Sequence, residues 1–233
     1  MIKKTNAFKG YFSKTEILLW VISVTLITVS FLVFGGTDIL TFVSSLVGVS
    51  AILLNAKGNP AGQLLMIVFS ALYGIISYGF SYYGEMMTYL GMTMPMAFVA
   101  LVSWIKHPYN GKKAEVKVNS ITKKEVAVML VLAAVVTIAF FFVLKYFNTA
   151  NLIPSTVSVT TSFLAVYLTF KRSPFFSVAY AANDIILIVL WVLASVSDKR
   201  FISVVVCFVA FLANDIYCFI GWQKLKSKQQ TER

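Results

Sequence analysis

Two asparagine–aspartate pairs lie inside long apolar segments of the chain, Asn183-Asp184 and Asn214-Asp215. Within a bilayer, polar and ionisable groups cost about 2.5–3.5 kcal/mol each, so such residues are candidates for function. An amide side chain both donates and accepts hydrogen bonds, which suits hydroxyl groups or a carboxamide. The carboxyl groups can face a cation, bond hydroxyls or be protonated. The alternative is a hydrogen-bonded clamp between two helices.

Aromatic side chains accompany these pairs. Tyr180, Asp184 and Trp191 share one helix face, because they are spaced by four and seven residues. Aromatic rings stack on a planar heterocycle and attract a cation. Further candidate ligand contacts are Tyr73, Tyr89 and Thr93, and the candidates for gating or the outer mouth are Pro95, Tyr83 and Glu85. Because 15% of the chain is aromatic, most rings are expected to serve packing or the membrane interface.

Catalytic, metal-binding and cofactor-binding patterns are missing from the sequence. His107 is the only histidine and lies in a basic loop, where we expect it to be solvated. Cys207 and Cys218 lie on one apolar segment, beyond disulfide reach of each other. No nucleophile motif or phosphate-binding glycine loop occurs. We therefore expect no enzyme activity, no cofactor and no metal.

The composition places all these residues in a membrane protein. Of the 233 residues, 59% are hydrophobic and 12% are charged, whereas soluble domains carry about 25% charged residues. The net charge of +11 is then explained by basic loops near anionic lipid rather than by nucleic-acid binding. Soluble folds, nucleic-acid-binding proteins and secreted disulfide scaffolds are excluded.

Eight apolar runs are each long enough to cross a bilayer as a helix. They cover residues 17–34, 39–56, 60–80, 85–105, 125–147, 152–170, 175–197 and 201–222. With the N-terminus inside, every Lys and Arg except Lys145, Lys199 and Arg200 falls on the inner side. We expect an all-α protein with eight transmembrane helices and both termini in the cytoplasm. Asn183 and Asn214 would then lie about 12 Å and about 10 Å from the inner face, at similar depth on antiparallel helices.

The sequence also contains an internal repeat. The turns 57–60 and 171–174 follow the first helix of each copy, and Trp104 and Trp222 close the copies 47 and 51 residues after the turn's lysine. Both copies run the same way through the membrane, which is typical of transporters with a site between the halves. The expected divisions are a basic tail with an extra helix (1–38), a first three-helix repeat (39–105), a basic loop with a linker helix (106–151), a second repeat (152–222) and a basic tail (223–233).

From about residue 40 to residue 224 the chain resembles the PnuC-type vitamin and nucleoside transporters of bacteria. The resemblance rests on Tyr83-Gly84-Glu85, on the tryptophan that closes each repeat, and on Asn183 and Asn214. It implies a SWEET-like three-plus-one-plus-three fold in the bacterial inner membrane, assembled as a homotrimer. It also implies uptake of nicotinamide riboside by facilitated diffusion, with trapping by phosphorylation in the cytoplasm.

Departures from the family pattern leave the substrate open. Ala179 stands four residues before Asn183, where the family often has an aromatic residue, and Thr88-Tyr89 replaces a frequent glutamine. Asp184 and Asp215 are outside the common pattern. Thiamine, riboflavin or a deoxynucleoside are alternative substrates, and Asp184 or Asp215 would allow coupling to protons. A membrane sensor or enzyme that uses the 106–124 loop, and an assembly protein, are alternatives of a different class.

Overall fold

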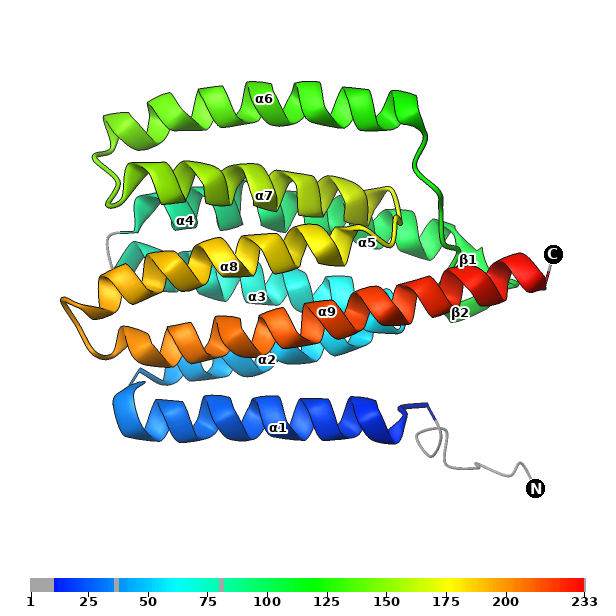
Figure 1. Cartoon of the computed structure of the whole chain (residues 1–233), viewed down its shortest axis with the longest axis horizontal. Helices are drawn as coiled ribbons and strands as arrows, with labels where there is room; N and C mark the ends of the chain where they lie inside the picture. Colours follow the sequence, from blue (N-terminus) through cyan, green and yellow to red (C-terminus); the bar gives the residue numbers. More distant parts are fainter. Residues whose placement is uncertain (1–10, 36–37, 80–81, 233) are drawn as a thin grey trace.

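The computed structural model describes residues 11–35, 38–79 and 82–232, and these residues are almost entirely helical (Figure 1). Within them, eight helical spans are long and apolar enough to cross a membrane. The elements are α1 (Lys14–Ser30), the π-helical turn η1 (Phe31–Gly35), α2 (Ile39–Ala56), α3 (Ala61–Gly79), α4 (Tyr83–Thr88), the π-helical turn η2 (Tyr89–Thr93), α5 (Met94–Lys106), β1 (Pro108–Tyr109), β2 (Lys112–Val116), α6 (Lys123–Tyr146), α7 (Leu152–Phe170), α8 (Phe176–Ser195) and α9 (Phe201–Thr231). The prediction of an all-α membrane protein with eight spans is confirmed. Lys3, Lys4 and Lys9 of the expected basic tail lie outside the described residues.

Reciprocal side-chain caps fix the start of two spans. At α1 the Glu16 amide donates to Ser13 Oγ at 3.2 Å, and the Ser13 amide donates to Glu16 Oε2 at 2.7 Å. Thr122 and Glu125 make the same pair of bonds at α6. These caps satisfy backbone donors that a helix start leaves unpaired, so both spans have defined beginnings.

The fourth span is interrupted rather than straight. It consists of α4, η2 and α5, and the Met94 amide reaches back five residues to the Tyr89 carbonyl. Pro95 follows directly; it has no amide hydrogen, and its ring crowds the preceding turn of a regular helix. The wider π-helical turn relieves this crowding. Pro95, a candidate gating residue from the sequence, thus directly follows a π-helical turn.

The helices lie side by side as one bundle, with α1 and α6 on opposite sides (Figure 1). α1 packs against α2 and α9, whereas α6 packs on α7. The six remaining spans form the core, in which α2 contacts α9 and α5 contacts α7. Each of these contacts joins the first helix of one expected repeat to the third helix of the other.

A short hairpin covers one end of the bundle. Its strands β1 and β2 are antiparallel, and Asn110 (φ 47°) and Gly111 (φ 74°) form the turn between them. Positive φ at both positions is the requirement of a tight hairpin turn, for which Asn-Gly is a preferred sequence. We call this end, formed by residues 57–60, 106–124, 171–174 and 223–232, the basic end. The sequence predicted only a polar loop for 106–124, and the hairpin within it was missed.

Two turns at the basic end are built alike. In the α2–α3 turn Gly58 (φ 65°) donates its amide hydrogen to the Asn55 carbonyl at 2.9 Å. In the α7–α8 turn Arg172 (φ 56°) donates its amide hydrogen to the Thr169 carbonyl at 3.0 Å. The hairpin segment bonds both turns, because the Val116 amide donates to the Gly58 carbonyl at 2.9 Å and the Asn119 amide donates to the Arg172 carbonyl at 3.0 Å.

Each closing tryptophan donates a hydrogen bond to a backbone carbonyl of the other group. These two carbonyls are the ones that accept from the turn amides of Gly58 and Arg172. Trp104 Nε1 on α5 donates to the Thr169 carbonyl on α7 at 3.0 Å. Trp222 Nε1 on α9 donates to the Asn55 carbonyl on α2 at 2.7 Å. The indole rings also touch, with centroids 5.3 Å apart. The two hydrogen bonds therefore join the third helix of each group to the first helix of the other, and the ring contact joins the two tryptophans.

Candidate functional site

An aromatic cluster fills the middle of the bundle. Tyr73 on α3 and Tyr89 on η2 meet with ring centroids 4.4 Å apart, and Trp191 Nε1 on α8 donates to the Tyr73 hydroxyl at 2.7 Å. Phe69 and Phe208 pack edge to face or stacked on Tyr73 at 5.6 Å. Three predicted site residues from three helices are thus brought together, while Phe69 and Phe208 were missed because phenylalanine is frequent throughout the sequence.

Two further rings close the cluster at the end opposite the basic end. Tyr82 lies 4.8 Å from Trp191, and Phe201 at the start of α9 lies 5.2 Å from it. Tyr83, predicted at the outer mouth, lies at this end, packs on Tyr78 at 6.1 Å and is partly exposed. The rings of Tyr82 and Phe201 therefore separate the cluster from this end of the bundle.

Buried carboxyl groups lie beside the aromatic cluster. Asp184 on α8 and Asp215 on α9 are both buried, and their carboxyl groups are neighbours. The electrostatic neighbours of Tyr89 include Asp184 and Glu85, so acidic groups adjoin the rings.

Glu85 occupies a different position from the one expected. The sequence predicted it at the outer mouth, but it is 1% exposed and packs between α4 and the other helices. Neither of its carboxylate oxygens makes a hydrogen bond to a described residue, although Ser158 on α7 is a polar neighbour. The reason is that α4 starts within the bundle, where Gly84 lies close to Leu144 and Ser155. An acidic side chain is thus enclosed in the interior, with Ser158 as its polar neighbour.

Asn183 is bonded to a row of hydroxyl groups on α7. Its Oδ1 accepts from Ser158 Oγ at 3.3 Å, from Thr161 Oγ1 at 2.8 Å and from Ser162 Oγ at 3.1 Å. The three bonds use only the oxygen of the amide, so its NH₂ group is not engaged by them. The hydroxyl row was not identified from the sequence.

Asn214 faces a different partner from Asn183. Its Nδ2 donates to Ser23 Oγ on α1 at 2.8 Å and to the Ala210 carbonyl at 2.7 Å. It therefore contacts the extra helix, not the hydroxyl row on α7, and acts as a clamp between α9 and α1. Its Oδ1 is buried and has no hydrogen bond to a described residue.

The remaining predicted site residues are buried around these groups. Tyr180 packs with Phe176 at 6.2 Å, towards the basic end. Thr93 lies at the end of η2, and its hydroxyl is buried without a hydrogen bond to a described residue. The cavity that borders the cluster, next to Ser44, Tyr73 and Cys207, measures about 10 Å³. This is room for about one water molecule, so the site is closed in this conformation.

Comparison with known proteins agrees with this architecture. The family model described as "Nicotinamide mononucleotide transporter" matches residues 38–224. A relative from Neisseria mucosa, named nicotinamide riboside transporter PnuC, is 27% identical over 197 residues, covering 83% of this chain and 75% of the relative. A protein of the same name from Haemophilus influenzae is 22% identical over 187 residues, covering 80% of each chain.

A solved structure is also similar over almost the whole chain. It is described as the crystal structure of the vitamin B3 transporter PnuC, and it matches with a TM-score of 0.82 and 26% identity. The match covers 94% of this chain and 95% of the other. The protein with eight spans is accordingly a membrane transporter and not an enzyme. It belongs to the nicotinamide mononucleotide transporter family, which includes the PnuC proteins.

Proposed function

We propose that this protein takes up nicotinamide riboside, the compound in the names of its relatives, and that it does so by facilitated diffusion. The observation that carries the proposal is the closed aromatic cluster of Tyr73, Tyr89 and Trp191 beside buried carboxyl groups. Nicotinamide riboside is a pyridinium cation joined to a ribose, and it carries a carboxamide. Aromatic faces attract such a cation, carboxylates neutralise it, and the NH₂ group of Asn183 suits its hydroxyl or carboxamide oxygens.

The proposed mechanism is alternating access between two parallel three-helix repeats joined by the linker helix α6. A cavity of about 10 Å³ has to widen before a nucleoside fits, so the two halves must move. The like-built turns at Gly58 and Arg172 and the reciprocal bonds of Trp104 and Trp222 support the three-plus-one-plus-three arrangement. Rocking of one repeat against the other around a central site is typical of transporters built from repeats.

We place the basic end in the cytoplasm of the cell, with the protein in the bacterial inner membrane and both termini inside. The positive-inside rule supports this orientation, because the cations remote from the basic end are few: Lys145, Lys199 and Arg200. Phosphorylation of the riboside in the cytoplasm would trap it as an anion. The functional unit in this proposal is a homotrimer, as the family resemblance implies.

Uptake by proteoliposomes tests the proposed substrate and site together. We expect labelled nicotinamide riboside to enter faster than thiamine, riboflavin or deoxynucleosides. Asn183→Leu should lower the initial rate more than tenfold, because it removes the amide and leaves three hydroxyls on α7 without their acceptor. Ser50→Ala, which removes the partner of Trp20 near the surface and a bond from the Ser50 hydroxyl to the Leu46 carbonyl of the same helix, is the control and should stay within twofold. Wild-type rates for Asn183→Leu would contradict the proposed site, and preference for another compound would replace the substrate.

A proton-coupled transporter on the same scaffold is the second candidate. It is favoured by the neighbouring buried carboxyl groups of Asp184 and Asp215, which could carry a proton through the bundle. Collapse of an imposed proton gradient distinguishes the two mechanisms: facilitated diffusion requires that the initial rate does not change, whereas coupling requires that it falls. Asp215→Asn should abolish the response to the gradient only if the coupled mechanism operates.

A further inference from the structure

A pocket of about 330 Å³ opens at the basic end, between residues 117–120, the α7–α8 turn and the last turns of α9. Lys117, Arg172 and Lys226 line it, His107 lies at its edge, and none of the described residues that line it is Asp or Glu. A pocket of this volume is large enough for a small ligand. Its charge favours an anion.

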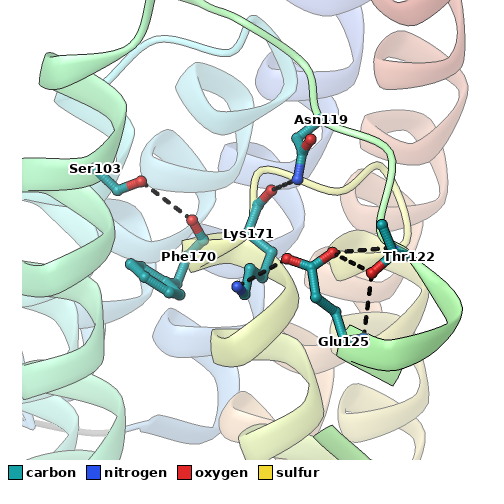
Figure 2. A network of polar contacts seen from close by, with 6 residues as sticks. All are labelled: Ser103, Asn119, Thr122, Glu125, Phe170 and Lys171. Atoms are coloured by element: carbon teal, nitrogen blue, oxygen red, sulfur yellow. Dashed lines mark hydrogen bonds and ion pairs between the residues drawn. The ribbon is translucent and has the colours of Figure 1, made fainter. Parts of the chain in front are cut away.

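The carboxylates nearby are already engaged with other partners. Glu125 pairs with Lys171 at 2.9 Å, and Figure 2 shows this pair beside the Thr122 cap of α6. Glu115 accepts from Gln229 Nε2 at 3.2 Å and lies 3.9 Å from Lys228 Nζ. Glu232 accepts from the Tyr109 hydroxyl at 2.8 Å. Lys171 is therefore neutralised, whereas Arg172 beside it is not.

Arg172 carries the strongest sign of a missing partner. Its Nε and Nη1 atoms are buried and make no hydrogen bond to a described residue. Burial lowers the pKa of this guanidinium, because no carboxylate compensates for the lost solvation. The residue also holds a positive φ of 56°, where the matching turn has Gly58, and this conformation is unfavourable for a residue with a Cβ. A half-buried guanidinium with two buried, unpaired nitrogens, on an unfavourable backbone, points to a role for the side chain.

Hydrogen bonds hold the walls of the pocket in place. Asn119 bonds the α7–α8 turn twice, through its amide to the Arg172 carbonyl at 3.0 Å and through Nδ2 to the Lys171 carbonyl at 3.2 Å; Figure 2 shows the second bond. On the other side the Val118 amide donates to Gln229 Oε1 at 2.8 Å. The pocket is thus built from three segments that are fixed to one another.

We propose that this pocket binds a phosphate-bearing anion. The planar guanidinium of Arg172 forms paired hydrogen bonds with phosphate oxygens, and Lys117 and Lys226 add positive charge. The phosphate can belong to a soluble compound or to a phospholipid headgroup. The second source is open because a neighbouring groove of about 530 Å³, lined by apolar residues of α5 and α7, shares His107, Asn119 and Arg172 with the pocket. The proposal does not depend on which compound the protein transports.

Binding measurements on the purified full-length protein test the site without any transport assay. The key variant is Arg172→Gly, because it removes the charge and introduces the residue that the matching turn already uses. Its fold should be retained, and unfolding without ligand should occur at the wild-type temperature or above. Lys113→Gln is the control, since it removes one exposed cation at the same end but outside the pocket.

Two arms separate the two sources of phosphate. In detergent, potassium phosphate should raise the unfolding temperature of the wild type and of Lys113→Gln more than potassium chloride of equal ionic strength, and Arg172→Gly should lose this increment. In phosphatidylcholine discs with or without phosphatidylglycerol, native mass spectrometry should show phosphatidylglycerol retained at least tenfold less by Arg172→Gly. Either difference supports the site and identifies the source. If Arg172→Gly equals the wild type in both arms, or if neither phosphate nor phosphatidylglycerol binds, the proposal is wrong.

Discussion

At the scale of single residues, the interior combines satisfied and unsatisfied polar groups. Trp191 and Tyr73 satisfy each other, whereas Glu85 and one oxygen of Asp184 have no hydrogen bond to a described residue. Buried polar groups without partners are costly, by about 1–3 kcal/mol each. Such groups are retained where a ligand or a proton supplies the partner, and a transporter interior is such a place.

The Trp191–Tyr73 bond makes a prediction that a double-mutant cycle can check. Tyr73→Phe and Trp191→Phe each break the same hydrogen bond, whose net value is about 1 kcal/mol. Each should lower the thermal unfolding temperature, and the double variant should lower it by less than the sum. Strictly additive shifts, measured by the same thermal unfolding assay, would show that the bond contributes nothing.

The neighbouring buried carboxyl groups of Asp184 and Asp215 lead to a second prediction, if a hydrogen bond joins them. Asp184→Asn keeps a neutral group that can donate to Asp215, so the unfolding temperature should stay close to that of the wild type. Asp184→Ala removes the donor and leaves a cavity and an unpaired acid, so unfolding should occur several degrees lower. Equal effects of the two substitutions on thermal unfolding would mean that the carboxyl pair is not held by a hydrogen bond.

The sequence predicts which residues belong to the site better than it predicts which way their side chains face. Tyr73, Tyr89 and Trp191 do converge, because each is a large ring in a span that enters the core. Asn214 was expected beside Asn183 because both lie at similar depth, yet it bonds Ser23 on α1. Depth follows from counting residues along a helix, whereas facing depends on how the helix is rotated against its neighbours, and packing decides that rotation.

At the scale of elements, close approach holds the helix pair α2–α3 together. A Cβ on Gly62 would lie 2.7 Å from the Asn55 backbone nitrogen and would also meet the Asn55 side chain. That side chain accepts a hydrogen bond from Gln63 Nε2 at 2.9 Å. Small residues that allow two membrane helices to approach closely are a recurrent basis of their association.

Gly62→Ala therefore should destabilise the protein, because the added methyl group pushes α2 away from α3 and strains the Asn55–Gln63 bond. We expect the unfolding temperature to fall by several degrees. Gly91→Ala is the matched control, since a Cβ at Gly91 meets no described atom within 4 Å. If the two substitutions shift thermal unfolding equally, the close contact is not what stabilises the pair.

The bounds of a helix could be predicted from the sequence where the helix coincides with an apolar run. The run 152–170 coincides with α7, and 60–80 is close to α3. The prediction ended the last span at residue 222, but α9 continues to Thr231, because Lys and Gln are good helix formers outside the membrane as well. The hairpin had a signal in Asn110-Gly111, which the basic charge of the surrounding loop obscured.

At the scale of the whole molecule, two tryptophans link the halves of the bundle. Trp104 and Trp222 donate to carbonyls of the opposite group and touch each other at the basic end. Each carbonyl lies in the last turn of a helix and also accepts a turn amide, that of Gly58 or of Arg172, so the indole uses its second acceptor position. The links therefore join both groups at once.

Replacing either tryptophan by phenylalanine should have the same consequence if the two groups are equivalent. Trp104→Phe and Trp222→Phe each remove one hydrogen bond to a helix-end carbonyl, with a net value of about 1 kcal/mol, and should lower the unfolding temperature by similar amounts. Trp20→Phe breaks a bond to Ser50 at an exposed position and serves as the control with a smaller effect. A marked difference between the first two variants would argue against equivalent repeats.

The helix α9 is continuous from one end of the bundle to the other, so a movement at one of its ends is transmitted to the other end. Its 31 residues make a rod about 46 Å long at 1.5 Å per residue. Phe201 at one tip meets Trp191, and Gln229 near the other tip holds the strand segment at Val116 and Val118. A rigid helix of this length that tilts by about 5° about its midpoint moves each of its ends by about 2 Å. A tilt of α9 that separates Phe201 from Trp191 at one surface consequently also displaces Gln229 and the hairpin segment bonded to it at the other.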